Sequence, residues 1–81
     1  MEVYEDLRGF PLNQQLRLLR YRRELTQGEL AKEIKTTKVS ISEWENGKRI
    51  PVGRTIERIR QYYGLPIGFL TIDETEEQLL N

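Results

Sequence analysis

The side chains best placed to do chemistry lie in the stretch 26–47, which reads TQGELAKEIKTTKVSISEWENG. This stretch predicts two short helices joined by a tight turn, and the second helix is polar on its outer side. A helix of that size fits the major groove of DNA. There Lys38 can donate to guanine O6 and N7, Glu43 can accept from cytosine N4, and Val39 can contact a thymine methyl. Two plainer interpretations stay open: Val39 contacts no base, and Glu43 is a solvated acid paired with a cation such as Lys38.

The composition excludes most other kinds of site. The 81 residues make one domain with a small core and include no Cys and no His, which removes disulfides, thiolate metal sites and the commonest general base. No nucleophile–base pair, metal cluster or phosphate loop is present, so we expect no enzyme, no cofactor and no metal. No apolar run is long enough to predict a membrane span, and the acidic N-terminus is unlike a signal peptide.

The formal net charge of zero conceals three regions of different charge. Residues 1–13 carry a net charge of −2, residues 14–64 carry +6 from twelve Lys and Arg against six acids, and residues 65–81 carry −4. A basic middle of this kind indicates a polyanion as partner. Three solvated faces of an ordinary domain would give the same charges, and this alternative stays open.

The spacing of the apolar residues predicts an all-α chain. We expect Trp44 to lie in the core beside Ile41 rather than to offer a stacking platform for a base, and Tyr63 to be buried on the stripe of its helix. Helices are predicted at 12–24, from Thr26 to the turn at 35–37, at 38–46 and at 54–63, with a short terminal helix or turn at 67–72.

Several residues predict where these helices begin and end. Thr26 and Glu29 have the spacing of a capping box, in which each side chain accepts a hydrogen bond from the backbone of the other. Thr37 is placed to cap the helix at 38–46. Gly47 and Gly64 supply the left-handed conformation that commonly follows a helix.

Together these residues carry a resemblance to a known family. The segments 26–31 (Thr-Gln-Gly-Glu-Leu-Ala) and 44–48 (Trp-Glu-Asn-Gly-Lys), followed by Pro51, resemble the Cro/C1-type helix-turn-helix family, the phage-repressor-like or XRE-like regulators. The resemblance covers about residues 14–70 and implies a compact five-helix bundle of the lambda-repressor-like DNA-binding type. We accordingly divide the chain into an acidic N-terminal extension, a helix-turn-helix domain and an acidic C-terminal tail, at 1–13, 14–72 and 73–81.

The resemblance also implies a DNA-binding site. Gln27 occupies the family's phosphate-contacting position at the start of the second helix, where free N–H groups attract an anion. Arg20 and Glu45 match a pair that commonly links the first and third helices, so their role is structural. The other DNA-binding candidates occupy positions near base edges or the phosphate backbone: Thr37, Lys38, Val39, Ser40, Ser42, Glu43, Asn46, Lys48 and Arg49.

Three positions depart from the family's pattern. Lys35 stands where the family usually has Gly in the turn, and Glu24 replaces a common Gly after the first helix. A left-handed conformation at Lys35 would cost on the order of 1 kcal/mol. Arg60 stands where a small apolar residue is usual, which indicates a position that is exposed or at an interface.

The function implied by the resemblance is sequence-specific DNA binding by a transcriptional regulator, a dimeric bacterial or phage repressor of the cytoplasm, associated with the nucleoid. Its partner would be double-stranded DNA with a pseudo-palindromic operator, because a homodimer doubles the contacts of one helix. The apolar residues of 65–72 would form the dimer surface, unless they only close the core. The alternative is an antitoxin-like or other protein-interaction module that also binds its own operator, with a protein partner at the acidic ends and no membrane.

Overall fold

The computed structural model describes residues 5–65 and 69–70. Its elements are a single 3-10 turn, η1 (Glu5–Leu7), and the helices α1 (Leu12–Arg22), α2 (Gln27–Glu33), α3 (Lys38–Glu45) and α4 (Gly53–Tyr63). No strand occurs in these ranges, which confirms the all-α prediction. The count of five helices is not supported: Phe69 and Leu70 are not helical, and the rest of the predicted segment 67–72 lies outside the described residues.

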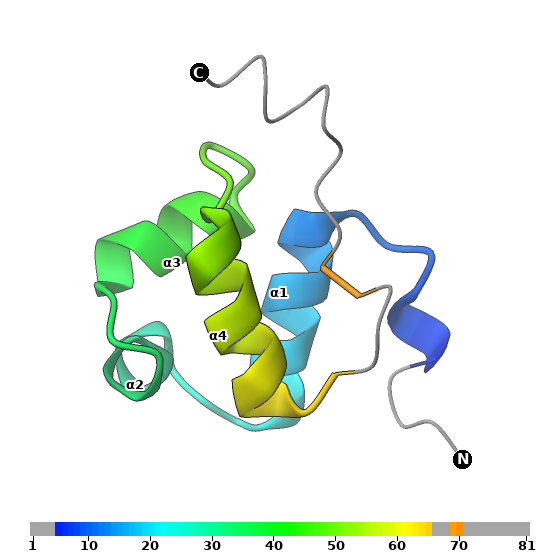
Figure 1. Ribbon diagram of the computed structural model, residues 1–81, viewed down its shortest axis with the longest axis horizontal. Helices are drawn as coiled ribbons and strands as arrows, with labels where there is room; N and C mark the ends of the chain where they lie inside the picture. Colours follow the sequence, from blue (N-terminus) through cyan, green and yellow to red (C-terminus); the bar gives the residue numbers. More distant parts are fainter. Residues whose placement is uncertain (1–4, 66–68, 71–81) are drawn as a thin grey trace.

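The helices enclose one hydrophobic core. In Figure 1, α2 and α3 lie together at the left, α4 crosses the centre of the view, and η1 lies on the far side of α1, which is in direct contact with α3. Trp44 is 7% exposed, which confirms its place in the core. Tyr63 is buried as predicted, and this burial raises the pKa of its phenol. The other apolar members of the core come from every element: Leu7, Leu16, Leu19, Leu30, Ala31, Ile34, Ile41, Ile56, Ile59, Phe69 and Leu70.

The predicted caps begin α2 and α3. Thr26 Oγ1 accepts a hydrogen bond from the Glu29 backbone N–H at 3.1 Å, and the Thr26 backbone N–H donates to Glu29 Oε1 at 2.8 Å. The capping box is therefore complete. Thr37 Oγ1 accepts from the Ser40 backbone N–H at 3.1 Å, which starts α3. These caps satisfy backbone donors that the first turn of a helix leaves without intrahelical partners.

All four α-helices end with the same hydrogen-bonded turn. A backbone N–H donates to the carbonyl five residues earlier, in the pairs Leu25–Arg20, Thr36–Ala31, Lys48–Glu43 and Leu65–Arg60, at 3.2, 2.9, 2.8 and 3.0 Å. This bond is the mark of the Schellman motif, which needs a left-handed residue just before the donor. The left-handed residues are Glu24, Lys35, Gly47 and Gly64, with φ of 54°, 58°, 74° and 67°.

Two of these four turns therefore use a residue other than glycine. Helix α1 ends at Arg22, two residues before the predicted end, because Glu24 has left the helical conformation. Lys35 adopts the left-handed conformation, which costs on the order of 1 kcal/mol relative to glycine. The turn between α2 and α3 nevertheless keeps the geometry that a glycine would give.

A buried glutamine joins the two ends of the described chain. Gln15 of α1 donates from Nε2 to the Leu7 carbonyl at 2.8 Å and accepts at Oε1 from the Leu70 backbone N–H at 3.2 Å. Leu7 and Leu70 are both almost fully buried. One side chain thus satisfies two backbone groups that would otherwise be buried without partners.

Arg60 is only partly exposed, and its contacts are with the chain after α4, which the sequence did not indicate. Its side chain is about one quarter exposed. Nε donates to the Phe69 carbonyl at 2.9 Å and Nη2 to the Leu70 carbonyl at 3.2 Å, while Nη1 pairs with Glu57. A small apolar residue there could not hold the chain that follows α4, because it has no donor for these carbonyls.

Candidate nucleic-acid interface

A buried ion pair fixes α3 against α1. Arg20 Nε donates to Glu45 Oε2 at 2.7 Å and Nη2 donates to Oε1 at 2.9 Å, and Glu45 is only 2% exposed. The hydrogen bonds that Arg20 donates to Glu45 raise the pKa of Arg20. The pairing suggested by the resemblance is confirmed, and its two parallel bonds define the orientation of α3 as well as its position.

Gln27, the predicted phosphate-binding residue, takes part in this same network. Its Nε2 donates to Glu45 Oε1 at 3.2 Å, and the residue is half-buried at the start of α2. One N–H of its amide is therefore directed into the protein. The structure thus gives Gln27 a supporting role that its position in the sequence did not indicate.

The outward side of α3 carries most of the other candidates. Thr37, Lys38 and Val39 are exposed at its N-terminal end, and Val39 is 67% exposed. Ser42 and Glu43 follow on the same side one turn later and are half-buried. Val39 therefore does not belong to the core, and its apolar surface is available to a partner.

Hydrogen bonds on this side hold several of the candidates in place. Thr37 Oγ1 donates to Ser40 Oγ at 3.0 Å, in addition to capping the helix. Glu43 pairs with Arg49 at 3.3 Å, rather than with Lys38, the partner considered from the sequence. The charge of Glu43 is therefore partly compensated within the protein.

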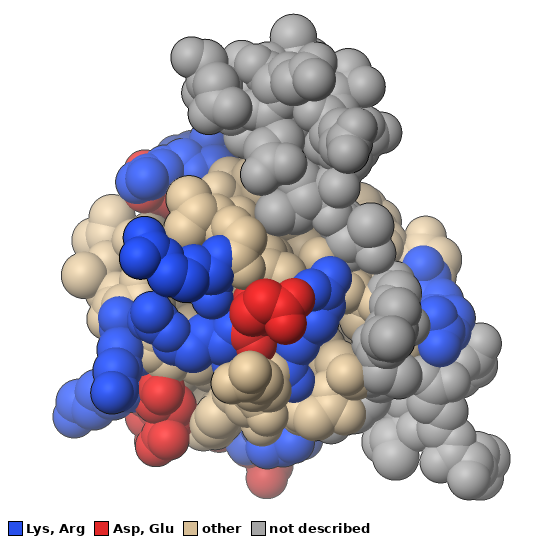
Figure 2. Space-filling model, in the orientation of Figure 1, with Lys and Arg blue, Asp and Glu red and all other residues tan. Residues whose placement is uncertain are grey.

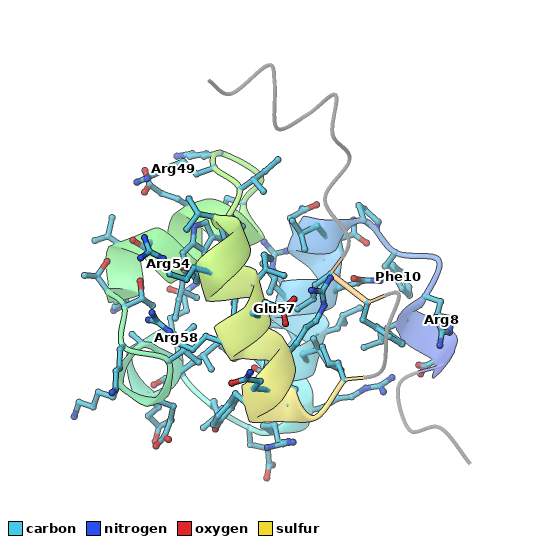
Figure 3. All side chains as sticks on the ribbon, viewed as in Figure 1. Arg8, Phe10, Arg49, Arg54, Glu57 and Arg58 are labelled. Atoms are coloured by element: carbon cyan, nitrogen blue, oxygen red, sulfur yellow. The ribbon has the colours of Figure 1, made fainter. Side chains whose placement is uncertain are left out.

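Figure 2 shows Lys and Arg side chains gathered over α4 and the neighbouring parts of α2 and α3. Two arginines outside the predicted site, Arg54 and Arg58, lie on the same side of the molecule as the predicted Arg49, as Figure 3 shows. Arg54 and Arg58 extend from α4 on the side of α3 and α2, and Arg49 lies in the loop after α3 (Figure 3). Arg58 Nη1 also donates to the Ile34 carbonyl at the end of α2, at 3.0 Å. Arg54 and Arg58 were not among the residues predicted from the sequence, although the positive charge of residues 14–64 was a signal for them.

Other kinds of site find little support in the described part of the chain. It holds no group of three or more residues able to bind a metal ion. No described helix is both long enough and apolar enough to cross a membrane. A cavity of about 170 Å³ lies between the start of α1 and the loop after α3, below the usual range of roughly 300–1,000 Å³ for small-molecule pockets.

Comparison with known proteins places the chain in a family. A model described as a helix-turn-helix domain matches residues 12–68. The HTH-type transcriptional activator BcrR of Enterococcus faecalis is 30% identical over 73 residues, which are 82% of this chain and 36% of BcrR. The cryptic phage CTXphi transcriptional repressor RstR of Vibrio cholerae is 36% identical over 58 residues, which are 72% of this chain and 52% of RstR.

The chain thus spans about a third of BcrR and about half of RstR. No solved structure matches it significantly. The family match extends from the first residue of α1 past the end of α4 and includes the turn between α2 and α3. In agreement with the resemblance to Cro/C1-type regulators, the chain belongs to the helix-turn-helix family.

Proposed function

We propose that this chain is a sequence-specific DNA-binding transcriptional regulator that reads the major groove with the outward side of α3. The observation that carries the proposal is the exposed end of α3, Lys38 and Val39, on a helix fixed from behind by the buried Arg20–Glu45 pair. A rigid helix with a free outer side can place donors against base edges without a large ordering cost. The activator and repressor names of BcrR and RstR support the same function.

The N-terminal residues of a recognition helix are those that contact base edges. Lys38 would donate to guanine, and Val39 would contact a thymine methyl. Glu43 would accept from a cytosine amino group if DNA binding releases it from Arg49, which would then be free for a phosphate. Thr37 and Ser42 would add hydroxyl contacts near the same bases.

Contacts with the sugar–phosphate backbone would hold the protein in register. We assign them to Gln27, which keeps one amide N–H beyond its bond to Glu45, and to the exposed Lys48 and Arg49 after α3. Ser40 completes the proposed set, whereas the amide of Asn46, also predicted from the sequence, is bonded to Arg17 and Ser42. Repression needs no more than occupancy of the DNA, so we propose a cytoplasmic repressor bound at the nucleoid.

We further propose that the regulator binds a pseudo-palindrome as a homodimer. The segment 65–72 can supply only part of the dimer surface, because Phe69 and Leu70 are fully buried in their own protomer. Leu65 is half-buried and remains a candidate. Ile67 and Ile72, also named from the sequence, lie outside the described residues.

Two lysines test the proposal: Lys38 at the start of α3 and Lys48 in the loop after it. Lys38→Ala should lose roughly 1–3 kcal/mol of discrimination at one base position, because Lys38 faces a base. Lys48→Ala is the matched control: it should weaken all sequences alike and reduce the slope of log affinity against log salt by about 1. Selection from random duplexes followed by titration at rising salt measures both. Failure of the wild type to bind any duplex at low salt would refute the function, and equal, uniform losses from both variants would refute the role of Lys38.

A further inference from the structure

Side chains of α1 hold the C-terminal end of α3. Asn13 Nδ2 and Arg17 Nη2 both donate to the Glu45 carbonyl, at 3.4 and 3.0 Å. Helix α3 has no basic residue in its last turn, so Arg17 places a positive charge at the negative end of its dipole. With the backbone bonds of the turn that follows, donors reach every one of the last four carbonyls of α3, those of Ser42, Glu43, Trp44 and Glu45.

The side-chain amide of Asn46, the residue after α3, is bonded within the protein at both of its ends. Oδ1 accepts from Arg17 Nη2 at 3.2 Å, and Nδ2 donates to Ser42 Oγ at 3.3 Å. Asn46 itself is exposed. Each end of the amide therefore keeps one bonding position for another partner, and Oδ1 fixes the guanidinium of Arg17 at an exposed edge of the protein.

No carboxylate of the described residues compensates the charge of Arg17. Both of its acceptors, the Glu45 carbonyl and the Asn46 amide oxygen, are neutral. By contrast, a carboxylate pairs with each of Arg20, Arg22, Arg49 and Arg60. Both bonds of Arg17 use Nη2, so the N–H groups of Nη1 and Nε remain available for another acceptor.

We propose that Arg17 binds a DNA phosphate at the edge of the groove that α3 reads, and that Asn46 positions its guanidinium for this contact. The proposal rests on the DNA-binding function proposed above. A recognition helix enters the groove by its N-terminal residues, so its C-terminal end emerges beside the phosphates. The carbonyl end of α3 and the neighbouring Glu43 would repel a phosphate there, and Arg17 supplies the charge that reverses this repulsion.

Salt dependence tests the contact. The probe is a pool of random-sequence duplexes of about two helical turns. Each neutralised phosphate contributes about 0.9 to the slope of log affinity against log salt, so Arg17→Gln should lower the slope by that amount. When the salt concentration rises fourfold, the affinity of the wild type should then fall about 3.5-fold further than the affinity of this variant. Arg17→Lys keeps the charge and should keep the slope.

Arg22→Gln is the matched control, because it removes the same charge from the same helix. Arg22 pairs with Asp6 of η1, and η1 lies across α1 from α3 (Figure 1). The slope of Arg22→Gln should equal that of the wild type. Asn46→Asp covers the case in which Arg17→Gln fails to fold: the new carboxylate would compensate the charge of Arg17 and lower the slope, while its ion pair with Arg17 should offset its repulsion from the carbonyl end of α3.

The positioning role has its own test. Asn46→Ala should weaken binding in the wild-type background and have no further effect in Arg17→Gln, because it acts through Arg17. Additive losses would show instead that Asn46 contacts DNA independently and would overturn the positioning role. If the wild type binds DNA but Arg17→Gln and Asn46→Asp both keep its slope, the phosphate contact alone would be overturned. A wild type that binds no duplex at low salt would overturn the DNA-binding function and this contact with it.

Discussion

Replacing Glu45 with Gln should remove a large part of the stability of the fold. The change keeps the side-chain volume but deprives Arg20 of its charge partner, and the two side chains are only 2% and 11% exposed. Removal of one partner from a buried pair costs about 3–5 kcal/mol, because the other charge is left uncompensated. The free energy of unfolding of a small domain lies near the lower end of about 5–15 kcal/mol, so this loss would leave the variant close to unfolding.

The remaining contacts of Arg20 indicate the lower end of that range. Its Nη1 would still donate to the Leu25 carbonyl at 2.8 Å, and the glutamine could still accept one bond. We therefore expect a loss of about 3 kcal/mol, which corresponds to a fall in Tm of about 12–24 °C for a domain of this size. Urea and thermal unfolding followed by circular dichroism measure both quantities.

Glu43→Gln is the matched control on the same helix. Glu43 also pairs with an arginine, but the Arg49 side chain is 65% exposed, and such surface pairs contribute about 0–1 kcal/mol. A double variant, Arg20→Met with Glu45→Leu, leaves no buried charge and should be more stable than Glu45→Gln alone. If Glu45→Gln lost no more stability than Glu43→Gln, the buried pair would not be what holds α3.

Three further predictions concern the turns, the caps and the chain ends. Lys35→Gly should raise the free energy of unfolding by up to about 1 kcal/mol by relieving the left-handed φ of 58°, whereas the control Lys32→Gly within α2 should lower it by about 1 kcal/mol, both by urea unfolding. Hydrogen bonds from Thr26, the N-cap residue of α2, lower the pKa of Glu29. The stability that the Glu29 carboxylate contributes is therefore present above its unfolded-state pKa and lost as pH falls through its folded-state pKa. Glu29→Gln should remove that part of the acid-side pH dependence of stability. Gln15→Leu should cost roughly 1–3 kcal/mol and speed hydrogen exchange at the Leu70 amide, which donates to Gln15.

Each of these has a clear contrary result. Lys35→Gly no more stable than the wild type would mean that the turn carries no conformational cost. If Glu29→Gln had the same pH dependence of stability as the wild type, the charge of the Glu29 carboxylate would not stabilise the capping box. Unchanged exchange at Leu70 would show that Gln15 does not hold the chain after α4.

Features set by neighbours in the chain were predictable. The capping box of Thr26 and Glu29 depends on side chains three residues apart, and Gly47 and Gly64 act on their own backbone. Trp44 was assigned to the core from its spacing to Ile41, again within one helix. These signals are local, so the positions of the helices follow from them to within about two residues.

Features set by distant residues were missed. Gln15 meets partners 8 and 55 residues away, and Arg17 reaches the end of α3 28 residues later. Nothing in their own neighbourhood distinguishes them from exposed polar residues of a helix. The partners of Arg60 were missed for the same reason, since its acceptors are carbonyls of residues that follow α4. The Arg20–Glu45 pair is as distant, and only the family resemblance made it predictable.

The contact between α3 and DNA can be measured directly by the amide chemical shifts of isotope-labelled protein as a selected duplex is added. A groove-reading α3 predicts the largest changes at Lys38, Val39 and Glu43, further changes at Arg17 and Asn46, and small ones around Arg22 and η1. Saturating binding that leaves α3 unshifted and perturbs only η1 or the outer side of α4 would contradict the proposed interface.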